Sequence, residues 1–244
     1  MKIYNIAWVV ILFLFASCDK KSYNEMVFVE GGQFYMGSND EDSDPDEHDI
    51  RLVSVHDFCI SRYEVTQSEW DEIMGEDISF FHGMNLPVEC VSWDDAILFI
   101  ERLNSKTGRH FRLPTESEWE YAAHGGKFVV ESRYSGSDSL TEVGWTRDNA
   151  RMSTHRVGLL RPNALGLYDM TGNVFEWCDG RYDSIYYSLD TLMNKEYDLK
   201  DIRIFKGGCF ISHAKHCRNA NTNYNTRETK SPTIGFRLAE DVNN

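Results

Sequence analysis

Residues 206–237 read KGGCFISHAKHCRNANTNYNTRETKSPTIGFR, and they decide how the whole chain is interpreted. This stretch, called the tail segment below, opens on Lys-Gly-Gly and closes on Ile-Gly-Phe-Arg. Between its ends lie two cysteines, two histidines and a run of asparagines. Thiols and imidazoles bind metals and take part in catalysis, whereas amides are adaptable hydrogen-bonding groups. The segment therefore raises the question of whether it catalyses a reaction or recognises a ligand.

The composition indicates a single acidic domain. The chain of 244 residues is long enough for one large domain, and no repeat or linker divides it. Its formal net charge of -14 argues against nucleic acid or an anionic membrane surface as a partner, because phosphate binding needs clustered Lys and Arg. Aromatic residues make up 13% of the chain, which favours a core built from large rings.

The N-terminus is interpreted as an export signal and not as part of the fold. An apolar run over residues 6–15 follows Lys2, and the small residues 16–17 precede Cys18. This order resembles a bacterial lipoprotein signal, in which cleavage before Cys18 frees that cysteine for lipid attachment. The run is too short to span a bilayer comfortably. The alternative is an ordinary secretory signal in which Cys18 has no special role.

The lipoprotein interpretation divides the chain into a signal peptide (1–17), a tether (18–25) and one domain (26–241). It places the protein outside the cytoplasm, anchored in the bacterial cell envelope through lipid on Cys18. The membrane is then a partner through this lipid alone. An exported location also permits disulfide bonds.

Three predicted helix starts share one local pattern, in which a hydroxyl side chain is followed three residues later by an acid. The pattern occurs at Thr66 and Glu69, at Ser92 and Asp95, and at Thr115 and Glu118. The hydroxyl accepts an N–H of the first turn, and the acid accepts the N–H of the cap residue. Apolar residues at three- and four-residue spacing then give each helix one buried face. Gly75, Gly108 and Gly125 mark the predicted ends.

The beginning of the domain is predicted to be a β-hairpin followed by an acidic loop. Polarity alternates on both sides of Gly31-Gly32, which is typical of two strands joined by a turn. Residues 40–49 hold seven acids in ten, which favours a solvated loop. A calcium loop is the alternative, but the spacing matches no EF-hand.

Six motifs in order carry a family resemblance. They are GGQFYMGS at 31–38, YEVT at 63–66, PVECVSWDDA at 87–96, RLPTESEWEYAA at 112–123, NALGLYDMTGNVFEWC at 163–178, and the Gly-Gly and Gly-Phe-Arg ends of the tail segment. Together they resemble the formylglycine-generating enzyme, or sulfatase-modifying factor, family. The resemblance implies a compact, loop-rich α+β domain whose fold is similar to that of C-type lectins.

The resemblance also implies a chemistry that this tail segment departs from. The founding enzymes of the family oxidise a substrate cysteine to formylglycine with copper(I) and O2, using two tail cysteines separated by four residues. Counting forward from the Gly-Gly end matches the first to Cys217, and counting back from Gly-Phe-Arg places the second at Asn219. Cys209 stands where the family usually has Ser. An amide cannot replace a thiolate for Cu(I), so copper binding and formylglycine synthesis are not expected.

Two interpretations remain for the cysteines and histidines of the tail segment. His213, His216 and Cys217 are all potential metal ligands or catalytic groups, and they are the weak catalytic candidates of this chain. In the favoured interpretation the histidines are exposed polar residues, and a disulfide between Cys209 and Cys217 stabilises the loop.

The motif at 171–176 resembles a calcium loop of the family. The resemblance implies that Asn173 gives its side-chain oxygen, Val174 its carbonyl and Glu176 its carboxylate, which are hard ligands suited to Ca²⁺. The alternative is that Asn173 caps a turn and Glu176 pairs with an arginine. The match of the whole motif favours calcium.

Two classes of function follow from these observations. In the favoured class the tail segment is a recognition surface for an envelope protein or glycan, with Asn219, Asn221, Asn223 and Tyr224 as contact residues. A structural part of an exported assembly is a variant of this class. In the other class the protein is an oxidoreductase acting on a sulfur or amine substrate, with Cys217 as thiolate and a nearby histidine as ligand or base.

Overall fold

The computed structural model describes residues 23, 25–44, 47–48, 50–128, 132–181 and 201–242. The predicted lipidation site Cys18 lies outside these ranges, so the lipoprotein interpretation stays a prediction. Within the described ranges, no helix is long and apolar enough to cross a membrane.

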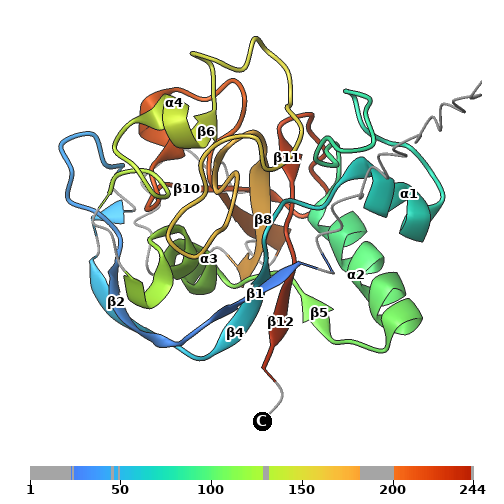
Figure 1. Ribbon diagram of the computed structural model, residues 1–244, viewed down its shortest axis with the longest axis horizontal. Coiled ribbons are helices and arrows are strands. Elements are labelled where there is room, and N and C mark those ends of the chain that lie inside the picture. The colour runs from blue at the N-terminus through green and yellow to red at the C-terminus, as the bar shows by residue number, and fades with distance from the viewer. Residues whose placement is uncertain are drawn as a thin grey trace, which may run out of the picture.

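Four short sheets organise the described part of the chain (Figure 1). The first has the order β1 (Met26–Val29), β4 (Phe58–Ser61), β12 (Ala239–Asp241) and β5 (Phe111–Arg112). The second has the order β10 (Thr222–Thr226), β9 (Ile202–Lys206), β8 (Phe175–Arg181) and β11 (Ile234–Gly235), with β11 parallel to β8. The two-stranded sheets pair β2 (Gly32–Met36) with β3 (Arg51–Val55), and β6 (Gly144–Trp145) with β7 (Thr171–Gly172). The tail segment starts at the end of β9 and supplies β10 and β11, so the second sheet positions it.

The helices begin where the sequence pattern predicts. They are α1 (Gln67–Met74), α2 (Trp93–Thr107) and α3 (Glu116–Ala123), followed by the short α4 (Leu140–Val143). The first three each carry a complete capping box. Gly75 and Gly108 end α1 and α2 in the left-handed conformation that favours glycine. These helices and short strands, joined by long loops, confirm the predicted loop-rich α+β class.

The predicted hairpin at the start of the domain is wrong. β1 pairs with β4, while β2 pairs with β3, so the two strands beside Gly31-Gly32 belong to different sheets. The chain crosses between the sheets at Gly31, whose N–H donates to Asp57 Oδ1 at 2.7 Å. A Cβ at Gly31 would stand 2.5 Å from the carbonyl oxygen of Val55. Close backbone contact, and not a turn, therefore explains this glycine.

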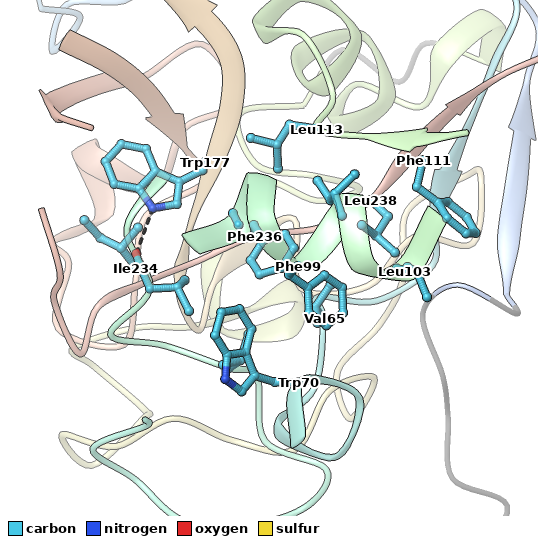
Figure 2. Packing of buried hydrophobic residues seen from close by; sticks show 14 of the residues in the cluster. Val65, Trp70, Phe99, Leu103, Phe111, Leu113, Trp177, Ile234, Phe236 and Leu238 are labelled. Carbon is cyan, nitrogen blue, oxygen red and sulfur yellow. Dashed lines mark hydrogen bonds between the residues drawn. The ribbon is translucent and has the colours of Figure 1, made fainter. Parts of the chain in front are cut away.

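An aromatic core fixes the closing end of the tail segment (Figure 2). The rings of Trp70 and Phe99 stack at 5.5 Å, and Phe236 meets both edge-on. Trp177 donates its indole N–H to the carbonyl oxygen of Val91 at 3.0 Å. Phe236 belongs to the Gly-Phe-Arg end, so its burial anchors that end in the core. In Figure 1, α1 and α2 lie together on one side of the molecule, and β2 lies on the opposite side.

Candidate functional site

Lys206 fixes the opening end of the tail segment. Its side chain is completely buried, and its Nζ donates to Glu120 Oε2 at 2.9 Å, to the carbonyl oxygen of Ala220 at 3.2 Å and to Thr222 Oγ1 at 3.0 Å. Burial opposes the charge of Lys206, but the carboxylates of Glu120 and Glu116 outweigh burial and raise its pKa. One buried cation therefore ties α3 to two points of the tail.

Cys209, Ser212 and Cys217 lie together in the interior of the tail segment. The Cys209 Sγ is 3.2 Å from Ser212 Oγ, and Cys217 lies close enough to both residues that each affects its pKa. Gly208 is required here, because a Cβ on it would stand 2.5 Å from Cys217 Sγ. Both thiols are buried and unbridged in the structure. The disulfide between them stays a prediction.

Ser212 also stands at the spacing from Cys217 that the cysteine pair of the family has. Ser212 and Cys217 are the two residues separated by four others, and they lie side by side. Asn219 instead contacts Ser132 and His124. Ser212 is therefore a second candidate, beside Asn219, for the position of the missing thiol, and Cys209 brings a sulfur to its neighbourhood.

The tail thiols are poorly suited to chemistry at neutral pH. Burial, followed by the nearby Cys209, raises the pKa of Cys217 to about 12. Burial also raises the pKa of Cys209. Thiols, and not thiolates, therefore predominate at both positions, and the thiolate is the nucleophile and the metal ligand.

The two histidines of the tail do not converge with Cys217. His213 is exposed, and its Nε2 lies 2.7 Å from Nη1 of Arg147. Cys217 donates to the backbone carbonyl of His213 and not to its imidazole ring. His216 is partly exposed, and burial together with Lys215 lowers its pKa. Across the described ranges, no group of three or more His, Cys, Asp or Glu side chains is placed to hold a metal ion. The three weak catalytic candidates therefore form no metal-ligand set.

Two of the three predicted contact asparagines are buried. Asn219 and Asn221 are 2% and 1% exposed. Asn221 donates to Asp44 Oδ2 at 3.2 Å and to Glu47 Oε1 at 2.9 Å. Asn223 and Tyr224 are partly buried in β10. Asn221 thus helps to hold the loop in shape, and a recognition surface that includes all four residues stays a prediction.

Residues 42–44 and Glu47 of the acidic loop contact the tail segment, so the expectation of a solvated loop is wrong at the buried Glu47. Glu47 forms a bidentate ion pair with Arg218, and both residues are at least 97% buried. Arg218 also donates to the carbonyl oxygen of Asp42, whose carboxylate pairs with Arg133. A buried guanidinium needs a carboxylate beside it, and the acidic loop supplies it.

A pocket of about 900 Å³ opens between the acidic loop and the tail segment. Its walls come from residues 33–42, from His124 with residues 132–138, and from residues 218–220. Asn219 lines it, and its buried Oδ1 accepts no hydrogen bond from the described residues. No local sequence pattern predicts this pocket, because its three walls are distant in the chain.

The predicted calcium ligand Glu176 is bound by protein donors. Its Oε1 accepts from Arg237 Nη2 at 2.6 Å, and its Oε2 accepts from Arg237 Nε and Trp119 Nε1, each at 2.6 Å. Three N–H donors thus occupy the two oxygens of a fully buried carboxylate. This arrangement does not fit a calcium ion and favours the alternative in which Glu176 pairs with an arginine.

The other two predicted calcium ligands are held by Glu64. Asn173 Oδ1 accepts from the backbone N–H of His155 at 2.9 Å, while its Nδ2 donates to Glu64 Oε2 at 2.7 Å. The N–H of Val174 donates to Glu64 Oε1 at 3.2 Å. Burial, and then the charges of Asp169 and Glu176, raise the pKa of Glu64 well above its usual value. Asn173, Val174 and Glu176 are thus brought near one another, but each through contacts with protein groups.

Comparison with known proteins agrees with this loop-rich fold. The chain matches the model of the sulfatase-modifying factor enzyme 1-like domain over residues 14–242, so it belongs to that family. It is 33% identical over 205 residues to the chaperone protein LppX of Paenibacillus barcinonensis, covering 64% of this chain and 71% of that protein. It is 34% identical over 176 residues to the formylglycine-generating enzyme of Streptomyces coelicolor, covering 65% of this chain and 54% of that enzyme.

A solved structure with the same fold is that of Treponema denticola variable protein 1. It aligns with a TM-score of 0.76 and 26% sequence identity, over 89% of this chain and 95% of that chain. Membership of the family and the overall fold are therefore shown, and the resemblance found in the six sequence motifs is confirmed.

Proposed function

We propose that this protein is a binding module of the cell envelope, anchored by lipid on Cys18, that does not make formylglycine. The observation that carries the proposal is the burial of every thiol in the tail segment, with the pKa of Cys217 raised to about 12. A copper dithiolate needs two thiolates, and the residue that matches the partner of Cys217 is here Ser212 or Asn219. The cysteines act as small core groups that hold the shape of the loop.

Two further features support a binding role. The side chains of Lys206, Arg218 and Asn221 bind groups of α3, the acidic loop and the tail itself, which fixes the part of the tail segment that lies between β9 and β10. The exposed residues of the tail include Ile211, His213 and Lys215. A preorganised surface loses little conformational entropy when it binds, which favours recognition.

The test combines metal analysis with an activity assay on the full chain purified in detergent. The protein is treated with Cu(I), freed of excess metal and incubated with O2 and a sulfatase-derived cysteine peptide. We expect less than stoichiometric copper and no loss of peptide thiol to formylglycine by mass spectrometry. Stoichiometric copper that disappears in Cys217→Ala but persists in Cys178→Ala, a buried cysteine outside the tail, would overturn the proposal.

One observation favours a second function, a metal-dependent oxidoreductase acting on a sulfur-containing or protein substrate. Cys209 brings a second sulfur to Ser212, beside Cys217, so two thiols lie near the position that the family uses for chemistry. A soft metal would have to displace both thiol protons, because only thiolates bind it well. Copper binding lost equally in Cys209→Ala and Cys217→Ala would support this alternative.

A further inference from the structure

The pocket beside Asn219 has the features of a small-molecule site that the proposed binding role leaves without a ligand. Its volume of about 900 Å³ falls within the range of roughly 300–1,000 Å³ found for such sites. The ion pairs Arg218–Glu47 and Arg133–Asp42 connect its walls. The pocket is therefore held open by buried or half-buried charges and is part of the folded structure.

Asn219 presents an acceptor that the described protein leaves unused. Its Nδ2 donates to the carbonyl oxygen of Ser132 at 3.1 Å and lies 3.4 Å from His124 Nδ1, so the orientation of the amide is defined. The Oδ1 atom is buried and accepts no hydrogen bond within the described residues. Leaving a buried polar group unpaired destabilises the folded protein, because the group has lost its hydrogen bonds to water. A ligand that donates an O–H or N–H here would remove that destabilisation.

Hydrogen-bond donors stand beside this acceptor. The contact with Asn219 makes His124 Nδ1 the acceptor nitrogen, so the ring hydrogen lies on Nε2. Burial lowers the pKa of His124, which keeps the ring neutral at neutral pH. Arg133, which also lines the pocket, has a buried Nε without an acceptor in the described part of the chain. A hydroxyl suits this mixture because a single oxygen both donates and accepts, which a peptide amide cannot do.

The charges of the pocket exclude anionic ligands. Asp40, Glu41 and Asp138 line it, and the two lining arginines, Arg133 and Arg218, are already paired with carboxylates. A phosphate or carboxylate would meet a net negative wall, whereas a neutral or amine-bearing molecule would not. The aromatic ring of Tyr35, 70% exposed at the rim, offers an apolar face on which a sugar ring can pack.

We propose that this pocket binds a neutral or amine-bearing carbohydrate of mono- to disaccharide size, with Asn219 Oδ1 accepting from a sugar hydroxyl and Tyr35 packing against the sugar ring. The site lies at the junction of the acidic loop and the tail segment, so the acidic loop is part of the binding structure. This inference rests on the proposed binding role and gives that role a ligand class.

The test titrates the full chain in detergent with D-galactose, D-glucosamine and D-glucuronate by saturation-transfer NMR and calorimetry. We expect saturation transfer to the first two sugars and none to the anionic one. Tyr35→Ala and Asn219→Ala should each weaken binding about tenfold or more, which corresponds to about 1.4 kcal/mol. Phe28→Ala, another exposed strand aromatic, lies outside the pocket and should leave binding unchanged.

Three results would overturn the inference. These are absence of transfer to both uncharged and amine-bearing sugars from protein with a native circular dichroism spectrum, equal binding of glucuronate, and unchanged affinity in Tyr35→Ala. The last variant alters an exposed side chain, so it remains informative if Asn219→Ala unfolds. Loss of sugar binding leaves the copper and peptide experiment untouched, and a positive copper result leaves the sugar titration untouched, so the two proposals fail separately.

Discussion

Two buried arginine–glutamate pairs use the same chemistry in different parts of the molecule. Arg237 binds Glu176 and Arg218 binds Glu47, each through two hydrogen bonds, and all four residues are at most 3% exposed. The surroundings differ. Arg237 also donates to the carbonyl oxygens of Ser61 and Tyr168, within the core. Arg218 reaches only loop groups, including the carbonyl oxygens of Asp42 and Lys215.

We call the core around the Arg237 pair the frame, and we call the layer formed by the acidic loop and the tail segment the cover. The Arg237 pair joins β8 to the C-terminal part of the chain, and its loss would affect every layer of the core. The Arg218 pair joins the acidic loop to the tail segment and forms one side of the pocket. A buried pair is weak evidence for stability by itself, but breaking one leaves an uncompensated charge. The two pairs should therefore respond differently to the same substitution.

The largest effect is expected for Arg237→Met. The substitution leaves Glu176 without its cation, and Glu64 and Asp169 lose a nearby positive charge as well. We expect a loss of about 3–5 kcal/mol in the free energy of unfolding, measured by urea denaturation. Adding Glu176→Gln should recover part of the loss. A single-variant loss below about 1 kcal/mol would contradict the assignment of this pair to the frame.

Arg218→Met should cost less, about 2–3 kcal/mol, because water in the adjacent pocket can partly solvate Glu47. Hydrogen exchange should quicken in the acidic loop and the tail segment and remain slow in β8. Arg227→Met is the matched control, because Arg227 pairs with Asp94 at the surface and that pair is worth at most about 1 kcal/mol. Equal losses of unfolding free energy in Arg218→Met and Arg227→Met would show that the buried Arg218 pair contributes no more than a surface pair.

Features set by neighbours in the sequence could be predicted, and features set by distant residues could not. The capping box of Thr115 with Glu118 is a local pattern, and the structure confirms the predicted helix start. Glu47 and Arg218 are 171 positions apart, and no local signal joins them. The hairpin prediction was wrong for the same reason, because it could not take account of the close contact between Gly31 and Val55. The orphan acceptor of Asn219 depends on three-dimensional contacts alone.

The labelling rate of the tail thiols measures how accessible the interior of the tail segment is. Because the pKa of Cys217 is raised from its ordinary 9.0 to about 12, its thiolate fraction near pH 8 should fall roughly a thousandfold. We expect iodoacetamide to label Cys217 at least about 100-fold more slowly in reduced native protein than in urea. Arg218→Met should raise the native labelling rate. Equal rates in native and unfolded protein would contradict the buried position, and non-reducing peptide mapping of the exported protein would report whether Cys209 and Cys217 are bridged.

A smaller effect is expected from the pH dependence of His124, which lies in the pocket wall of the cover. Burial lowers its pKa in the folded state, Glu120 opposes the shift and Lys206 adds to it. The unfolded chain then binds a proton below about pH 6.5 that the folded chain does not, so stability should be complete above that pH and fall below it. His124→Asn should flatten this part of the profile, measured by urea denaturation at several pH values. If the pH dependence of the unfolding free energy were the same in His124→Asn as in the parent protein, a group other than His124 would be responsible for it.

Calcium should have the smallest effect of all, because the frame occupies the predicted ligands. An ion at Asn173, Val174 and Glu176 would have to displace Arg237 and Trp119 from the carboxylate of Glu176. A ligand that binds the folded state raises the melting temperature by an amount that increases with its concentration and its affinity. We therefore expect the same melting temperature in calcium and in chelator, at matched ionic strength. A calcium-dependent rise that Glu176→Gln abolishes would instead show that the frame opens to take the ion, and the comparison of frame and cover would have to be revised.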